Sequence, residues 1–129
     1  MKLLLDTCVL LWLMMDSKRI SPTLREVLAN PTNTRYLSAV SVWEVVVKWH
    51  NGKLGLPKPP AEFFAEVRAR GRIRAVPLED AAILQLGKLP KLHADPFDRM
   101  LICQAIENGM TIVTPDAAIG QYPIKSLWL

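Results

Sequence analysis

The sequence contains little cysteine, and its two thiols lie far apart. Cys8 and Cys103 form no CxxC pair and match no zinc-ligand spacing. Half of the residues are apolar, so the chain can bury a core without cross-links. Both cysteines are therefore expected to be reduced thiols in the core of a cytosolic protein.

Long apolar runs are lacking as well. Leu3–Leu5 is interrupted by Asp6, and the apolar stretch Val9–Met15 is too short to cross a bilayer. Lys2 and the following leucines imitate the start of a signal peptide, but no small-residue cleavage site follows them. The chain is therefore expected to be soluble and cytoplasmic, with no membrane partner.

Repeats, low-complexity tracts and linkers are also absent from the 129 residues, which is the length of one ordinary domain spanning 1–129. Sixteen basic residues and twelve acidic ones give a formal charge of +4 and a pI near 9.3. This balance permits an anionic partner, either a nucleic acid or an acidic protein, but it does not choose between them.

Strand-like and helix-like segments alternate along the chain. Short apolar runs predict strands at Lys2–Leu5, Tyr36–Val40, Ile73–Val76, Thr111–Thr114 and Ser126–Leu129. Caps and glycine or proline boundaries predict helices at Cys8–Met15, Ser21–Asn30, Ser41–Trp49, Ala61–Arg70, Glu79–Gly87 and Asp95–Asn108. This alternation is typical of an α/β protein, a three-layer α/β/α sandwich around a mostly parallel sheet of four to five strands.

Four acidic residues fall where such a sheet binds ligands, outside the carboxyl ends of its strands. Asp6 directly follows the first strand, and Asp116 lies two residues beyond the fourth. Glu44 falls in the first turn of the helix after the second strand, which begins at the same rim. Asp98 falls in the first turn of the helix before the fourth strand, although a long segment precedes that helix. The acids are therefore expected to converge.

Each acid also has a purely structural interpretation. Ser41-x-x-Glu44 has the spacing of a capping box, in which the glutamate satisfies backbone donors. Asp95-Pro96 is typical of a helix N-cap, and Asp98 then lies where the helix dipole favours an anion. The other two acids can end a strand or cap a short helix. Taken singly, these interpretations are at least as good as a functional one.

The four acids together are harder to explain structurally. Like charges ~4 Å apart repel by roughly 4 kcal/mol per pair at an effective dielectric near 20. No lysine or arginine is placed by the sequence to neutralise all four, whereas a divalent cation would do so. Oxygen ligands without a histidine or thiol cluster suit Mg²⁺ or Mn²⁺. With these four set aside, sixteen basic residues face eight acidic ones, as a nuclease with metal at the scissile phosphate requires.

Four stretches of the chain form a recognisable set in their order and spacing: Leu3–Thr7 (LLLDT), Ser41–Glu44 (SVWE), His93–Arg99 (HADPFDR) and Thr111–Asp116 (TIVTPD). They resemble PIN-domain proteins, and in particular the VapC-type toxins of bacterial toxin–antitoxin pairs. The resemblance covers essentially the whole chain, including the Gly52-Lys53-Leu54 turn, and its most specific stretch is HADPFDR.

This resemblance implies a Mg²⁺- or Mn²⁺-dependent endoribonuclease that cleaves structured or single-stranded RNA. It also implies a homodimer and a cognate antitoxin whose C-terminal segment occupies the site. The metal-binding and catalytic acids of the family carry over onto Asp6, Glu44, Asp98 and Asp116. We expect Asp6 and Asp98 to bind the metal directly and Asp116 to complete the shell, directly or through water. Glu44 is expected to hold a second metal or to orient the attacking water.

Five further residues are candidates for supporting the acids or for contacting substrate. The hydroxyls of Thr7, Ser41 and Thr114 can bond the carboxylates or a phosphate, or simply bond their local backbone. Arg99 can contact a phosphate or form a surface ion pair. Asp95 is first a helix N-cap, with support of the site as the alternative.

The histidines and tryptophans are ambiguous. His50 lies near a helix end, where an imidazole suits the dipole. His93 can contact RNA, although a capping or loop role is favoured, and neither histidine is assigned catalysis. Trp12, Trp43 and Trp49 can stack on bases, but on helices with apolar neighbours they are more often core or interface residues.

The apolar excess of Val9–Met15 is larger than one buried helix face requires. It indicates a groove between the first helix and the Trp43 helix as an antitoxin seat. Burial of those residues within the monomer would remove the reason for this placement.

Two other classes of protein remain alternatives. A phosphoacceptor receiver module would need paired acids after the first strand and an aspartate after the third. Here Asp6 stands alone, Pro77-Leu78 follows the third strand, and Lys125 only loosely fits the required late lysine. A catalytically inactive PIN-like domain that binds RNA or protein is the second alternative, and the presence of all four acids argues against it.

Overall fold

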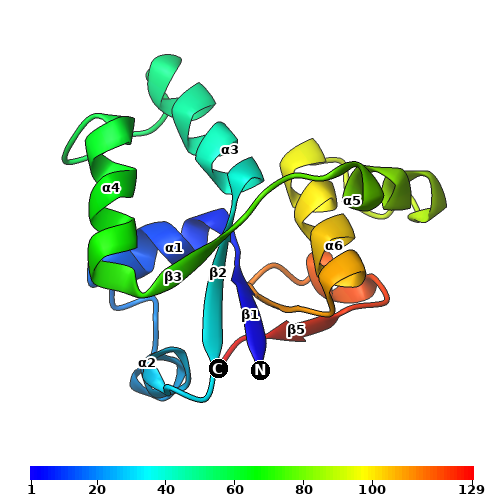
Figure 1. Ribbon diagram of the computed structural model, residues 1–129, viewed down its shortest axis with the longest axis horizontal. Helices are drawn as coiled ribbons and strands as arrows, with labels where there is room; N and C mark the ends of the chain where they lie inside the picture. Colours follow the sequence, from blue (N-terminus) through cyan, green and yellow to red (C-terminus); the bar gives the residue numbers. More distant parts are fainter.

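A parallel five-stranded sheet forms the centre of the computed structural model, which describes residues 1–129 (Figure 1). The strand order is β3-β2-β1-β4-β5, and every neighbouring pair is parallel. The strands are β1 (Lys2–Leu5), β2 (Thr34–Ser38), β3 (Ile73–Val76), β4 (Thr111–Val113) and β5 (Lys125–Leu127). The predicted α/β class and the fifth strand are confirmed.

Six α-helices surround this sheet and make the three-layer sandwich. They are α1 (Thr7–Met14), α2 (Pro22–Ala29), α3 (Ala39–His50), α4 (Pro60–Gly71), α5 (Asp80–Gln85) and α6 (Pro96–Asn108), and two short 3₁₀ helices add η1 (Leu86–Lys88) and η2 (Ile119–Gln121). None of these helices has both the length and the apolar character needed to span a membrane.

The alternation of side chains along β1 assigns the helices to the two faces of the sheet. Leu3 and Leu5 point into a core shared with α1, α2 and α4, whereas Leu4 points into a second core shared with α6. All three leucines are fully buried, as expected for a central parallel strand covered on both faces. Helix α3 contributes Val45 to the first core and Val40 to the second, so it lies at the carboxyl-end rim between the two layers.

The second strand and the helix after it begin earlier than the sequence predicts. Strand β2 ends at Ser38, whose hydroxyl accepts a hydrogen bond from the backbone N–H of Val40 and caps α3. Ser41 lies inside the helix, so the predicted capping box with Glu44 is wrong, and Glu44 lies in the second turn rather than the first. Ser38 is the cap instead of Ser41 because its buried hydroxyl also bonds the amide oxygen of Gln104 on α6. The local sequence does not reveal this partner.

The apolar run of the first helix is largely used inside the monomer. Val9 and Leu10 are buried, and Leu11 to Met14 are half-buried against the first core. Only Met15 is exposed, at 48%. The excess that placed an antitoxin seat on this helix is therefore mostly internal packing, and that reason for the placement is removed.

Candidate metal centre

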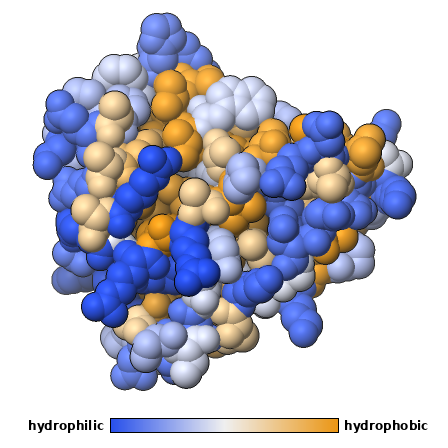
Figure 2. All heavy atoms as spheres, in the orientation of Figure 1, coloured by the Kyte–Doolittle hydropathy of each residue, from blue (hydrophilic) through white to orange (hydrophobic).

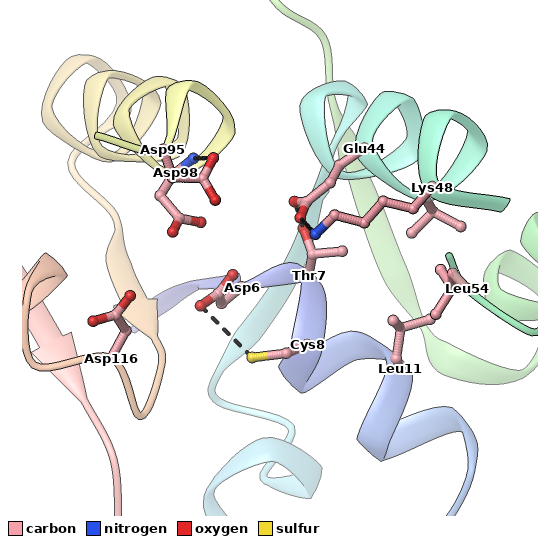
Figure 3. A pocket seen from close by; sticks show the side chains of 11 residues that line it. Asp6, Thr7, Cys8, Leu11, Glu44, Lys48, Leu54, Asp95, Asp98 and Asp116 are labelled. Atoms are coloured by element: carbon pink, nitrogen blue, oxygen red, sulfur yellow. Dashed lines mark hydrogen bonds and ion pairs between the residues drawn. The ribbon is translucent and has the colours of Figure 1, made fainter. Parts of the chain in front are cut away.

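A pocket of about 270 Å³ opens at the carboxyl ends of β1 and β4, between α1, α3 and α6 (Figure 3). Five acids from four separate parts of the chain line it, together with Thr7, Cys8 and Lys48; the acids are Asp6, Glu44, Asp95, Asp98 and Asp116. The structure thus brings together all four acids predicted as metal ligands. Figure 3 shows Asp6, Asp98 and Asp116 facing a common space, with Glu44 further along the pocket.

Asp6 begins α1 at the end of the central strand. It is 6% exposed, and its Oδ2 accepts a hydrogen bond of 2.7 Å from the Thr114 hydroxyl. The Cys8 thiol lies 3.7 Å from the same oxygen. Burial raises the pKa of Asp6, the Thr114 hydrogen bond opposes that rise, and the nearby Glu44 adds to it. This carboxyl is therefore held in position, although its surroundings oppose its ionisation.

Asp98 lies on the opposite wall of the pocket, in the first turn of α6. Asp95 caps this helix as predicted, because its Oδ1 accepts hydrogen bonds from the backbone N–H groups of Phe97 and Asp98. Burial, followed by the charges of Asp6 and Asp95, raises the pKa of Asp98 to about 7. In a cation-binding pocket that holds no cation, neighbouring carboxylates oppose the ionisation of one another in this way.

His93 completes this cluster, and the sequence prediction did not assign it to the site. Its Nε2 lies 2.9 Å from Asp98 Oδ2 and 3.3 Å from Asp116 Oδ2. Ligand atoms of these three residues all lie within 4.8 Å of one another. The phenolic oxygen of Tyr122 accepts hydrogen bonds from the backbone N–H groups of Leu92 and His93 and so holds the loop that presents the imidazole.

Asp116 is tied to Asp6 through one threonine. The backbone N–H of Asp116 donates to Thr114 Oγ1 at 3.1 Å, and that hydroxyl donates to Asp6. The Asp116 Oδ1 atom also accepts from the backbone N–H of Ala118, so its expected local turn role is present too. Thr114 therefore positions both Asp6 and Asp116. Bonding a carboxylate of the site was one of the roles predicted for its hydroxyl.

Glu44 has partners of its own. Its Oε1 is 2.8 Å from the Thr7 hydroxyl, which lies 2.9 Å from the buried Ser41 hydroxyl. Its Oε2 pairs with Lys48 Nζ, one helical turn further along α3. The hydrogen bond that the Lys48 ammonium donates to Glu44 raises the pKa of Lys48. Glu44 is thus compensated within the protein, whereas the three aspartates have no lysine or arginine partner.

Three other predicted residues have different surroundings. Arg99 does not line the pocket; its Nε is buried without a hydrogen-bond partner, and it forms no ion pair. Cys8 lines the pocket, where burial and Asp6 raise its thiol pKa to about 12 and keep it protonated. Cys103 is a free thiol in the second core.

The tryptophans and the second histidine lie outside the pocket. Trp12 packs edge-on against Trp128, and Trp43 packs edge-on against Phe97 while remaining 57% exposed. His50 ends α3, as predicted.

The donor set fits a hard divalent cation. Three aspartate carboxylates surround the common space, and the imidazole of His93 lies beside two of them, Asp98 and Asp116. Carboxylate oxygens are the ligands that suit Mg²⁺ or Mn²⁺. Burial, and then the charges of Asp6 and Asp95, raise the pKa of Asp98, and a bound cation would offset both effects.

Comparison with known proteins identifies the family. The chain matches the PIN domain over residues 3–125 and belongs to the PIN-domain family. PIN domains are generally nucleases that bind divalent metals. A comparison with curated proteins found no match.

Solved structures with the same fold include toxin–antitoxin complexes. A chain of VapBC2 from Rickettsia felis, bound to a DNA fragment from their promoter, is 16% identical with a TM-score of 0.73 over 98% of both chains. DNA-bound VapBC from Salmonella typhimurium gives 18% identity and a TM-score of 0.67 over 98% of this chain and 97% of that one. FitAcB from Neisseria gonorrhoeae gives 18% identity and a TM-score of 0.61, over 98% of this chain and 96% of that one. At these identities the likeness establishes the shared fold.

Proposed function

We propose that this protein is a Mg²⁺- or Mn²⁺-dependent endoribonuclease and the toxin of a toxin–antitoxin pair. The observation that supports this most strongly is the convergence of Asp6, Asp98 and Asp116 on one space, although each comes from a different part of the chain. None of the three has a lysine or arginine partner. A structural role for each acid explains its own position but not the meeting of all three.

The aspartates are the proposed metal ligands, and the bound metal would supply an activated water and stabilise charge on the phosphoryl oxygens. Asp6 and Asp98 bind directly, and Asp116 completes the shell. Thr114 holds Asp6 and Asp116 at a fixed separation through its two hydrogen bonds. Because Asp6 is held by Thr114 and Asp98 lies on α6, these two carboxylates have little side-chain entropy left to lose on metal binding.

Glu44 and Lys48 form the second part of the mechanism. Thr7 and Lys48 bond the two oxygens of Glu44 and so hold this carboxylate in place to orient the attacking water. The Lys48 side chain is 45% exposed at the pocket, where its ammonium is placed to attract the RNA phosphate. A cation bound by Asp98 and Asp116 would compete with His93 for their carboxylates, and the displaced imidazole would then be free to contact the substrate.

The toxin role rests on the family and on its neighbours. Solved structures that share the fold are VapBC and FitAB complexes, so we infer a cognate antitoxin, a homodimer and a cytoplasmic site of action. Helix α3 carries three exposed apolar side chains next to the pocket: Trp43 is 57%, Val46 39% and Trp49 40% exposed. We place the antitoxin contact on this helix, beside the metal pocket, and not on α1.

Cleavage of RNA by purified protein, freed of any bound partner, tests the proposal. Labelled RNA is incubated with wild type and with Asp98→Asn, in Mg²⁺, in Mn²⁺ and in EDTA. We expect cleavage by wild type only with metal, and a loss of about a hundredfold or more in the variant. Equal cleavage by both proteins removes Asp98 from the site. Absence of cleavage under every condition, with RNA binding retained, favours an inactive RNA-binding PIN domain instead.

A further inference from the structure

A basic depression lies at the amino ends of β2 and β3, the end of the sheet opposite to the metal pocket. It has a volume of about 430 Å³ and is bounded by the end of α4 and the loop after α2. Four arginines line it, and no acidic residue does: Arg35, Arg68, Arg72 and Arg74. Figure 2 shows the most hydrophilic side chains gathered over this region of β3 and α4.

These arginines have no acidic partners. The ion pairs of the protein involve Arg25, Lys48, Lys58, Arg70 and His93, and none of the four. Arg35 is anchored by a hydrogen bond to the backbone carbonyl of Gly71. Its pKa is lowered by burial and by the neighbouring Arg72 guanidinium. Like charges have therefore been brought together without an internal group that balances them, which is typical of a surface that binds an anion.

The backbone of Arg72 gives a second, independent observation. Arg72 follows α4 in the left-handed conformation, with φ 47° and ψ 44°. The end of α6 has the same geometry at Gly109, with φ 64° and ψ 41°. Glycine is the residue that this position favours, because a Cβ there is strained by roughly 1 kcal/mol. The chain thus carries a guanidinium where backbone stability alone favours glycine, which indicates a role for the side chain.

We propose that this arginine depression binds the phosphodiester backbone of the RNA substrate, at a distance from the cleavage site. Guanidinium groups form paired hydrogen bonds with phosphate oxygens, and arginines on two strands and a helix suit a repeating anion better than a single one. The polar side chains of Asn33 and Thr34 line the same depression and offer further hydrogen bonds to phosphate or ribose. The naming of RNA as the ligand rests on the proposed function.

The position of the depression specifies the kind of RNA. Strands of four or five residues separate the two ends of the sheet by roughly 13–17 Å. The depression also lies at edge strand β3, two strands away from β1. A ligand that contacts both sites must therefore extend over several nucleotides, so the substrate class is a folded or long RNA rather than a short oligonucleotide.

RNA binding in EDTA tests this inference without requiring cleavage. The anisotropy of a labelled RNA hairpin is measured against salt for wild type and for the double variant Arg68→Gln/Arg72→Gly, which leaves the structural Arg35 in place. The control is Lys18→Gln/Lys88→Gln, which removes the same charge from exposed lysines outside the depression. We expect the arginine variant to bind about tenfold or more weakly, with a salt slope reduced by roughly 1.5, and the control to resemble wild type.

Folding of the variant is checked by thermal unfolding, and Arg72→Gly alone is expected to melt at or above the wild-type temperature. If the double variant does not fold, Arg72→Gly and Arg74→Gln are measured singly. Equal weakening in the arginine variant and the lysine control overturns the inference, as does unchanged RNA binding in the arginine variant. Loss of duplex DNA binding with RNA binding intact also overturns it. Failure of the nuclease proposal appears separately, as RNA that binds but is not cut in Mg²⁺.

Discussion

Asp98 should make the metal-free protein less stable as the pH rises, which is the opposite of an ordinary paired aspartate. Its pKa in the folded protein is about 7, against 3.8 for the unpaired group. Below pH 3.8 both folded and unfolded chains carry the proton, so Asp98 contributes nothing. Between the two values the folded chain binds more protons, and stability falls by about 1.4 kcal/mol per pH unit. Above pH 7 the full penalty amounts to about 4 kcal/mol.

The substitution Asp98→Asn removes this penalty, since the amide keeps the shape of the carboxyl without its charge. Free energies of unfolding are measured by urea titration in EDTA from pH 4 to pH 8 for both proteins. The difference, variant minus wild type, should rise by up to about 4 kcal/mol across this range, and Mg²⁺ should restore wild type alone. A difference that stays flat with pH would show that neither burial nor the neighbouring acids oppose the ionisation of Asp98, and the reasoning for a cation site would fail.

Other substitutions test single parts of the site. Thr114→Val removes the donor to Asp6 and should cost about 1–3 kcal/mol of stability and weaken Mg²⁺ binding, both restored by Thr114→Ser; urea titration and calorimetry measure these effects. Lys48→Met should tighten Mg²⁺ binding severalfold, because it removes a positive charge that repels the metal. The same variant should slow cleavage, because that charge attracts RNA. Weakened metal binding would contradict this role. Ser38→Ala should destabilise the fold by about 1–2 kcal/mol, because it removes the cap of α3, and urea titration measures this loss.

The convergence of the aspartates could be predicted from the sequence because their positions follow from topology, whereas their role as metal ligands stays a prediction. A short apolar strand followed at once by Asp6, and a second followed two residues later by Asp116, can only end at the same rim of a parallel sheet. Asp98 was placed by its cap, since Asp95-Pro96 fixes where α6 begins. These positions follow from local sequence signals, namely the ends of two apolar strands and one helix cap.

The errors lie where a distant partner decides the outcome. Ser38 and Ser41 are both plausible caps by local sequence, and the choice falls on the one that bonds Gln104, 66 residues away. His93 reaches the site because Tyr122 holds its loop from across the chain. The spacing His93-x-Asp95 within the most specific motif was the one signal that pointed to it. Neither the contact of Ser38 with Gln104 nor that of Tyr122 with His93 leaves a periodic or turn pattern in the sequence that would reveal it.

The most direct test of the metal centre is the position of Mn²⁺ in crystals of the protein, read from its anomalous scattering. The account predicts a peak within about 2.5 Å of carboxylate oxygens of Asp6 and Asp98, with Asp116 in the shell and His93 moved away from both of its present partners. The absence of a peak in this pocket at millimolar Mn²⁺, or a peak that leaves Asp6 and Asp98 unligated, would contradict the claim that these acids form one metal site.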